Sequence, residues 1–206
     1  MAADPTELLV LGAATLGESG GIALAPRLRP AWPGAQVAGP AYAVTCSPGD
    51  NLAAHVAVTL APPGSVLVVD ATAEPARGYW GEVLTTAAEA RAIAGLVLDG
   101  GVRDVSALAA HGFPVFSALI ALRGATKVSG GYVGGSAKVG DSMVATGDWV
   151  VADADGVTVI PTAAHDTVLA AARARATKEQ ALFVALRAGA TTIELLDLDP
   201  LAVERL

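Results

Sequence analysis

Hydrophobic and polar positions divide the chain into short uncharged runs and longer stretches of mixed polarity. The runs SVLVVD (65–70) and GLVLDG (95–100) are almost continuously apolar, which is typical of strands buried on both faces. A third strand is predicted at 113–119. Helices are predicted between these strands, over 81–93 and from Asp104 to the stop at Gly112. This strand–helix alternation predicts parallel pairing and an α/β fold.

The rest of the chain shows weaker patterns. The pattern predicts a helix at 6–16 with Thr6 as N-cap, a turn-rich connection at 26–34, a strand at 36–46, a helix at 52–60 capped by Asn51, hairpins or a small barrel at 127–161, and a long helix at 163–188. We therefore expect one α/β domain over 1–162. A C-terminal helical extension over 163–206 would pack on the same or a neighbouring subunit.

Composition and charge exclude several classes of protein. Hydrophobic residues make up 53% of the 206 residues and charged residues 16%, which excludes a disordered chain. The net charge is -7 and lysines and arginines form no cluster, so we expect no nucleic-acid partner. Prolines interrupt the uncharged segments 30–49 and 52–69, so no membrane span is predicted. The N-terminal segment has no basic region before an apolar run, so we expect a cytoplasmic protein.

Cysteine content and the type of apolar residue refine this picture. Cys46 is the single cysteine, which excludes an intramolecular disulfide and a cysteine-rich zinc site. The apolar content is mainly Ala, Val and Leu, which suits close packing and a subunit interface. We expect a homo-oligomer.

The segment LDGGVRD (98–104) is the strongest local signal for chemistry. Ligands of parallel α/β folds bind beyond the carboxyl ends of strands, and a glycine pair lets the backbone approach a ligand. Arg103 can bind a carboxylate or an enolate, and Asp104 can hold a hard cation such as Mg²⁺. A surface Arg–Asp pair with Asp104 as a helix cap explains the same residues. Both interpretations remain open.

The segment WGE (80–82) is the second signal, because it precedes a predicted helix at the same edge. The amides of Val83 and Leu84 would form an anion site, and Glu82 could face a metal directly or through water. Glu82 could equally be an ordinary acidic residue in a first helical turn. His55, His111 and His165 are too far apart in the sequence to predict a metal triad.

Four segments together resemble the RraA-like family. They are RPAWPGAQVAGPAYAVTCSPGDN (29–51), PPGSVLVVD (62–70), GYWGEVLTTAAEARAIAGLVLDGGVRDVSALAAHGFPVF (78–116) and GDWVVADADGVTVIP (147–161). That family includes 4-hydroxy-4-methyl-2-oxoglutarate/4-carboxy-4-hydroxy-2-oxoadipate aldolases and the regulator of ribonuclease E activity. The resemblance implies a swivelling β/β/α single domain with a C-terminal helical arm. It also implies a trimer, or a hexamer of two trimers, with active sites between subunits.

The same resemblance assigns roles to individual residues of a divalent-metal-dependent (class II) pyruvate aldolase. Asp104 would bind Mg²⁺ or Mn²⁺, and Arg103 would stabilise the pyruvate enolate. Gly81, Val83 and Leu84 would bind the substrate carboxylate. Glu82 would bind metal-coordinated water, and Glu179 would reach a neighbouring subunit's site. The small-molecule substrate would be a 4-hydroxy-2-oxo diacid, cleaved to pyruvate and a second oxo acid.

Further consequences concern side activities and alternatives. Oxaloacetate decarboxylation passes through the same enolate, so this activity is expected as well. Two positions depart from the family pattern, namely Ala107, where the family often has an acidic residue, and Asp141, where it favours glycine. Either could alter or abolish activity. The alternative is a non-catalytic, protein-binding regulator of a ribonuclease, and a methyltransferase is disfavoured because no glycine-rich nucleotide site is present near the N-terminus.

Overall fold

The computed structural model describes residues 4–204 and contains strands and helices in mixed order. The strands are β1 (Ile22–Ala23), β2 (Arg29–Pro30), β3 (Val37–Cys46), β4 (Val66–Asp70), β5 (Gly78–Trp80), β6 (Gly95–Val102), β7 (Val115–Ile120), β8 (Gly131–Val133), β9 (Ser136–Val139), β10 (Ser142–Ala145), β11 (Trp149–Asp153) and β12 (Gly156–Ile160). The helices are α1 (Pro5–Glu18), α2 (Leu52–Leu60), α3 (Glu82–Glu89), α4 (Val105–His111), α5 (His165–Arg187) and α6 (Thr192–Leu195), with 3-10 turns at Thr162–Ala164 and Pro200–Ala202.

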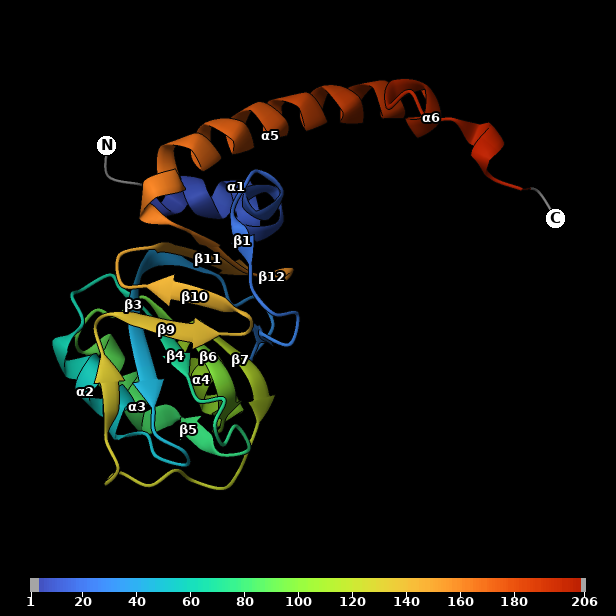
Figure 1. Ribbon diagram of the computed structural model, residues 1–206. Coiled ribbons are helices and arrows are strands. Elements are labelled where there is room, and N and C mark those ends of the chain that lie inside the picture. The colour runs from blue at the N-terminus through green and yellow to red at the C-terminus, as the bar shows by residue number, and fades with distance from the viewer. Residues whose placement is uncertain (1–3, 205–206) are drawn as a thin grey trace.

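A curled, mixed sheet forms the centre of the molecule (Figure 1). Its strand order is β1-β12-β11-β3-β4-β6-β7-β2, with β5 beside β6 and β8 beside β3. The pairs β3–β4, β4–β6 and β6–β7 are parallel, which confirms the predicted α/β class. Their carboxyl ends meet at the lower edge of the molecule in Figure 1. Loops from distant parts of the sequence therefore converge there.

The central parallel strands are buried on both faces, as their continuous apolar runs predict. Leu67 and Leu96 pack toward the layer of α2, α3 and α4. Val68 and Val97, one position further along each strand, pack against the β9–β12 region. Alternate residues thus supply two separate cores, since successive side chains of a strand point to opposite faces.

The glycine-rich region after 127 folds into hairpins, as predicted. β9 pairs with β10, and β11 pairs with β12, both in antiparallel register. β11 also joins β3, which connects this half to the parallel half.

Several local predictions were wrong. The N-cap of α1 is Asp4, whose carboxylate accepts a hydrogen bond from the amide of Thr6, and Gly12 interrupts this helix with φ 79°. Asn51 occupies the predicted N-cap position of α2, but its side chain makes no capping bond; Asp50 Oδ1 accepts from the amide of Leu52 instead, at 2.9 Å. α3 ends at Glu89, short of the predicted 93. The short strands β1, β2 and β5 were not predicted, because two or three residues give no usable periodicity.

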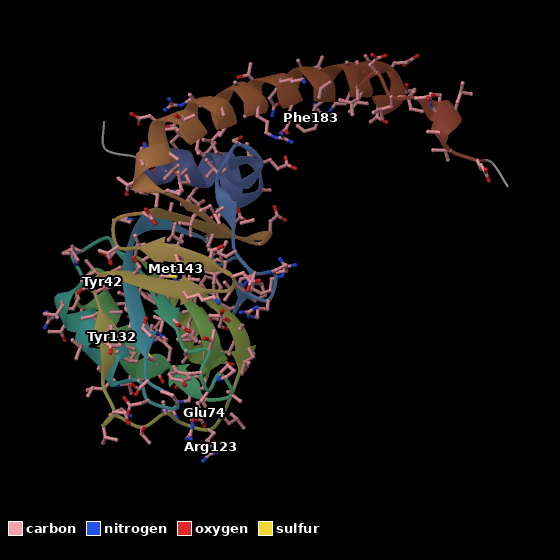
Figure 2. The ribbon with its side chains drawn as sticks, viewed as in Figure 1. Tyr42, Glu74, Arg123, Tyr132, Met143 and Phe183 are labelled. Atoms are coloured by element: carbon pink, nitrogen blue, oxygen red, sulfur yellow. The ribbon has the colours of Figure 1, made fainter. Side chains whose placement is uncertain are left out.

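The predicted C-terminal helix is confirmed as α5. Its first half packs on α1 and β11 through Val168, Leu169 and Ala172, and Arg173 pairs with Glu7 at 2.6 Å. The second half extends past the sheet, and Phe183 lies on this extension (Figure 2). Among residues 4–204, no helix combines the length and apolar character that crossing a membrane requires.

Candidate functional site

A pocket of about 100 Å³ lies at the carboxyl edge of the parallel strands. β5 supplies its floor with Gly78, Tyr79 and Trp80. The pocket has two walls. The α3–α4 wall consists of Gly81, Val83, Leu84, Arg103 and Asp104, and the α2 wall consists of Asn51, His55 and Lys127.

Asp104 lies at the start of α4 with φ 57° and ψ 36°, a left-handed conformation that few residues other than glycine, Asn and Asp adopt. Its carboxylate does not cap α4. Oδ2 instead accepts a hydrogen bond from the amide of Glu82, 3.1 Å away at the start of α3. Arg103 Nε lies 3.7 Å from the same oxygen. Asp104 therefore occupies the N-cap position of α4, as the alternative interpretation expected, but its side chain does not cap that helix and instead links two segments that the sequence separates.

Because Gly81 has no side chain, the carboxylate of Asp104 can occupy the space beside it. A Cβ atom at position 81 would overlap Asp104 Oδ2 and would lie 3.1 Å from Arg103 Cγ. The next residues begin α3, where the first amides of a helix have no acceptor in the helix. Among the described residues, the amides of Val83 and Leu84 have no hydrogen-bond acceptor, and both residues line the pocket. This wall thus combines a guanidinium, a carboxylate and two free amides.

Glu82 is placed differently from these neighbours. Glu82 does not line the pocket, and its Oε1 lies 3.7 Å from His111 Nε2. His111 Nδ1 also contacts Glu89 Oε2 at 2.8 Å. Glu89, and more weakly Glu82, raise the pKa of His111. His111 therefore bridges the carboxyl end of α4 to both ends of α3.

The residues of the α2 wall were not predicted as site residues. Asn51 is 6% exposed; its Nδ2 donates to the Tyr79 carbonyl at 2.8 Å, while Oδ1 has no partner within the described residues. His55 is half-buried on α2, and burial, followed by the charge of Lys127, lowers its pKa. The position of Asn51 just beyond the carboxyl end of β3 was a usable signal, because ligands bind at such ends. Nothing in the sequence around Lys127 indicated the pocket.

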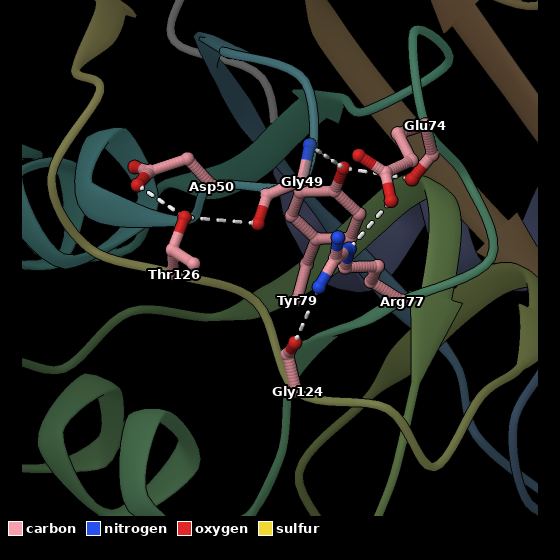
Figure 3. Close-up of polar contacts among 7 residues, drawn as sticks. All are labelled: Gly49, Asp50, Glu74, Arg77, Tyr79, Gly124 and Thr126. Atoms are coloured by element: carbon pink, nitrogen blue, oxygen red, sulfur yellow. Dashed lines mark hydrogen bonds and ion pairs between the residues drawn. The ribbon is translucent and has the colours of Figure 1, made fainter.

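Asp50 fastens the loop that carries Lys127 (Figure 3). Its Oδ2 accepts hydrogen bonds from the hydroxyl of Thr126 and from the amides of Val128 and Ser129. Burial alone would raise the pKa of Asp50, but these donors and the amide of Leu52 outweigh it and lower the pKa to about 2. A buried carboxylate that is ionised at neutral pH thus holds the loop against the start of α2.

Further contacts in Figure 3 join this loop to β5. The Tyr79 hydroxyl donates to the Glu74 carbonyl and accepts from the amide of Gly49. Arg77 pairs with the Glu74 carboxylate at 2.7 Å and reaches the Gly124 carbonyl at 3.3 Å. The floor and the α2 wall are therefore one connected hydrogen-bonded unit.

The glycine pair of LDGG does not face a ligand. Cβ atoms at Gly100 and Gly101 would meet Ala71 Cβ at 2.8 Å and the Arg77 carbonyl at 2.5 Å, so neighbouring protein fills this space. The strand continues to Val102, and Asp99 is buried within it. Asp99 forms two hydrogen bonds with Arg27, at 2.6 and 2.8 Å, and accepts a third from the amide of Gly140. The segment up to Gly101 is therefore structural, and only Arg103 and Asp104 of LDGGVRD line the pocket.

The remaining predicted residues lie outside the pocket of this chain. Glu179 pairs with Arg175 on α5, at the end of the molecule opposite to the pocket in Figure 1. Its role at a neighbouring subunit's site stays a prediction. Ala107 belongs to α4 but does not line the pocket. Asp141 lies in the turn between β9 and β10, away from the lining residues.

Comparison with known proteins decides the family. Residues 13–159 match the family described as "RraA-like: Aldolase/RraA". The chain belongs to the RraA-like family. A relative from Halalkalibacterium halodurans, named "Putative 4-hydroxy-4-methyl-2-oxoglutarate aldolase", is 37% identical over 146 residues, which span 71% of this chain and 70% of the relative.

Two solved structures share this RraA-like fold. An uncharacterised protein from Pseudomonas syringae pv. tomato superimposes with a TM-score of 0.82 and 27% identity, covering 90% of this chain and 89% of that protein. RraAS2 from Streptomyces coelicolor, described as an unusual member of the RNase ES inhibitor RraA protein family, gives a TM-score of 0.76 and 25% identity over 88% and 96% of the two chains. The swivelling RraA-like fold class expected from the sequence is thereby confirmed.

The RraA-like family implies a divalent metal, and the donor set of this pocket fits one. Mg²⁺ is commonly held by one or two carboxylates while water and substrate oxygens complete its shell. Within residues 4–204, Asp104 Oδ1 accepts no hydrogen bond, so it is available as such a ligand. Residues 4–204 contain no group of three or more His, Cys, Asp or Glu side chains arranged to hold a metal. A cation here would therefore be held by Asp104 together with a bound substrate.

Proposed function

We propose that this RraA-like protein is a class II pyruvate aldolase that cleaves a 4-hydroxy-2-oxo diacid. The observation that carries the proposal is the convergence of Arg103, Asp104 and two unpartnered amides on one small pocket. Each group matches one requirement of a 2-oxo acid. The amides of Val83 and Leu84 bind its carboxylate, and Arg103 contacts its 2-oxo oxygen. The "aldolase" in the names of several relatives supports the same assignment.

The reaction breaks the bond between C3 and C4 of the substrate. The 4-hydroxyl group gives its proton to the water through which Glu82 acts and becomes the carbonyl of the second product. The bonding electrons pass to C3 and the 2-oxo group as an enolate. Arg103 stabilises the negative charge that develops on the 2-oxo oxygen. Protonation at C3 then gives pyruvate. We assign Asp104 to holding Mg²⁺ or Mn²⁺, which when bound serves as an electron sink for the enolate.

Glu82 and the C-terminal arm have supporting roles in this proposal. Since Glu82 does not line the pocket, we propose that it acts through an intervening water. The outer part of the C-terminal arm, from the second half of α5 onward, exposes apolar side chains. Phe183, Val184 and Leu201 have exposed fractions of 41%, 66% and 91%. Their exposure supports a homo-oligomer, which we propose to be a trimer or a hexamer. Light scattering of the purified chain measures its state directly.

A coupled assay for pyruvate tests the aldolase proposal. We expect release of pyruvate from 4-hydroxy-4-methyl-2-oxoglutarate, and CO₂ and pyruvate from oxaloacetate, with Mg²⁺ or Mn²⁺ but not after chelation. Asp104→Ala should abolish turnover, and Arg103→Ala should reduce kcat/KM by about 10²–10³-fold. If the wild-type protein releases no pyruvate from any member of a panel of 4-hydroxy-2-oxo acids or from oxaloacetate, the proposal is wrong.

A ribonuclease-binding regulator is the second candidate. The solved relative described within an RNase ES inhibitor family and the net charge of -7 favour it, since an acidic surface suits a basic partner. A pull-down of a purified RNase E-type ribonuclease by the tagged chain, at two salt concentrations, would distinguish this candidate from the aldolase.

A further inference from the structure

The α2 wall contains a cation that no acidic group of the described chain neutralises. Lys127 lines the pocket and forms no ion pair within residues 4–204. The nearest buried carboxylate, Asp50, is fully engaged. One oxygen accepts from the amide of Leu52, and the other accepts from Thr126, Val128 and Ser129. Asp50 positions the loop and leaves the ammonium group of Lys127 available to a ligand.

A second, independent observation in the same wall also points to a ligand. Asn51 is more than nine-tenths buried and lines the pocket, yet its Oδ1 has no donor within the described residues. Because Nδ2 already binds the Tyr79 carbonyl, the amide orientation is set by protein contacts. A buried acceptor without a donor costs free energy unless a bound molecule supplies one, and the 4-hydroxyl group of the proposed substrate is such a donor. His55 beside it is half-buried and its pKa is lowered, so it adds polarity to this wall without a full charge.

Both walls line the same pocket, which has a volume of only about 100 Å³. In so small a pocket, a 2-oxo acid that binds the amides of Val83 and Leu84 through its first carboxylate lies within reach of the α2 wall. The far end of the ligand then meets Lys127, for which a second carboxylate is the complementary group.

We propose that Lys127 binds the second carboxylate of the ligand and so makes the pocket selective for 2-oxo dicarboxylates over 2-oxo monocarboxylates. This inference rests on the proposed function for the placement of the first carboxylate. Lys127 would then determine specificity, in addition to the groups of the α3–α4 wall that bind the first carboxylate. Asp50 holds the loop that carries Lys127 in place.

Calorimetric binding of two matched ligands tests the inference without requiring turnover. 2-Oxoglutarate and 2-oxopentanoate differ at C5, where a carboxylate replaces a methyl group. With Mg²⁺ present, we expect the wild-type chain to bind 2-oxoglutarate about tenfold more tightly, the low end for a hydrogen bond between charged groups at a partly solvated site. Lys127→Gln should remove this preference, and Lys127→Arg should retain most of it.

Lys138→Gln is the matched control, because Lys138 is an exposed lysine on β9 outside the pocket. It should leave the preference unchanged. Equal binding of both ligands by the wild-type protein, or an unchanged preference in Lys127→Gln, would overturn the inference. A clear preference without pyruvate release in the coupled assay would instead refute the aldolase proposal and leave the role of Lys127 standing.

Discussion

The two walls of the pocket are built in opposite ways. The α3–α4 wall is exposed, since the side chains of Arg103 and Asp104 have exposed fractions of 44% and 41%. It is held by the hydrogen bond between the start of α3 and the Asp104 carboxylate at the start of α4. The α2 wall depends on Asp50, which is fully buried and binds a loop 76 positions further along the chain. The first wall presents reactive groups at a helix start, whereas the second presents binding groups on a buried polar frame. The comparison suggests that chemistry and selectivity depend on different kinds of stabilisation.

Gly81→Ala should break the α3–α4 wall alone and produce the largest effect. The new methyl group would occupy the position of Asp104 Oδ2, so the carboxylate must move. A displacement of about 1 Å at a reacting group costs on the order of 10²-fold in rate, so kcat/KM for pyruvate release should fall at least that far. The melting temperature should change little, since φ of Gly81 is -168° and suits alanine.

The control for this substitution is Gly135→Ala. Gly135 lies in open space, where an added Cβ meets nothing within 4 Å, and it does not line the pocket between the two walls. Wild-type rates are expected. Full activity in Gly81→Ala would show that the observed position of Asp104 is not required.

Asp50→Asn should break the α2 wall alone, and its effect should appear as lost stability. The neutral amide loses charge-assisted hydrogen bonds from Val128 and Ser129, and its NH₂ group faces donors. A pKa lowered to about 2 from the ordinary value corresponds to about 2 kcal/mol in the free energy of unfolding at neutral pH. Urea denaturation at pH 7 measures this loss.

The pH dependence identifies the cause of that loss. Because folding lowers the pKa of Asp50, its contribution is present above the unfolded pKa of about 4 and disappears as the pH falls toward 2. The difference between wild type and Asp50→Asn should therefore shrink over that range. Asp155 is an exposed residue whose carboxylate makes no hydrogen bond within residues 4–204. Asp155→Asn should therefore show no comparable difference. A difference that does not depend on pH would contradict ionised Asp50 as the source.

The same contrast explains what could be predicted from the sequence. Arg103, Asp104, Val83 and Leu84 lie near strand ends and helix starts, so local pattern and the ligand-edge rule marked them as candidates, and the family resemblance supplied their expected roles. Lys127 reaches the pocket only because Asp50 binds its loop, and no local pattern encodes that contact. The sheet was predictable for a similar reason. Long apolar runs specify β4 and β6, whereas β5 has three residues and depends on its neighbours.

His111→Gln sharpens the comparison with the smallest effect, because it loosens the α3–α4 wall without touching its reactive groups. His111 joins α4 to α3 through Glu89 at 2.8 Å and Glu82 at 3.7 Å. These carboxylates raise its pKa, so its stabilising charge is fully present below the unfolded pKa of about 6.5 and is lost as the pH rises through the higher folded value.

Thermal melts of wild type and His111→Gln across this range measure the effect. The variant should melt slightly lower than wild type at pH 6, and the gap should close by about pH 9, since imidazole is then neutral. This direction is opposite to that of Asp50→Asn, whose deficit is greatest at neutral pH. If both variants lost stability with the same pH profile, the two walls would share one electrostatic origin, and the distinction between an exposed reactive wall and a buried binding frame would fail.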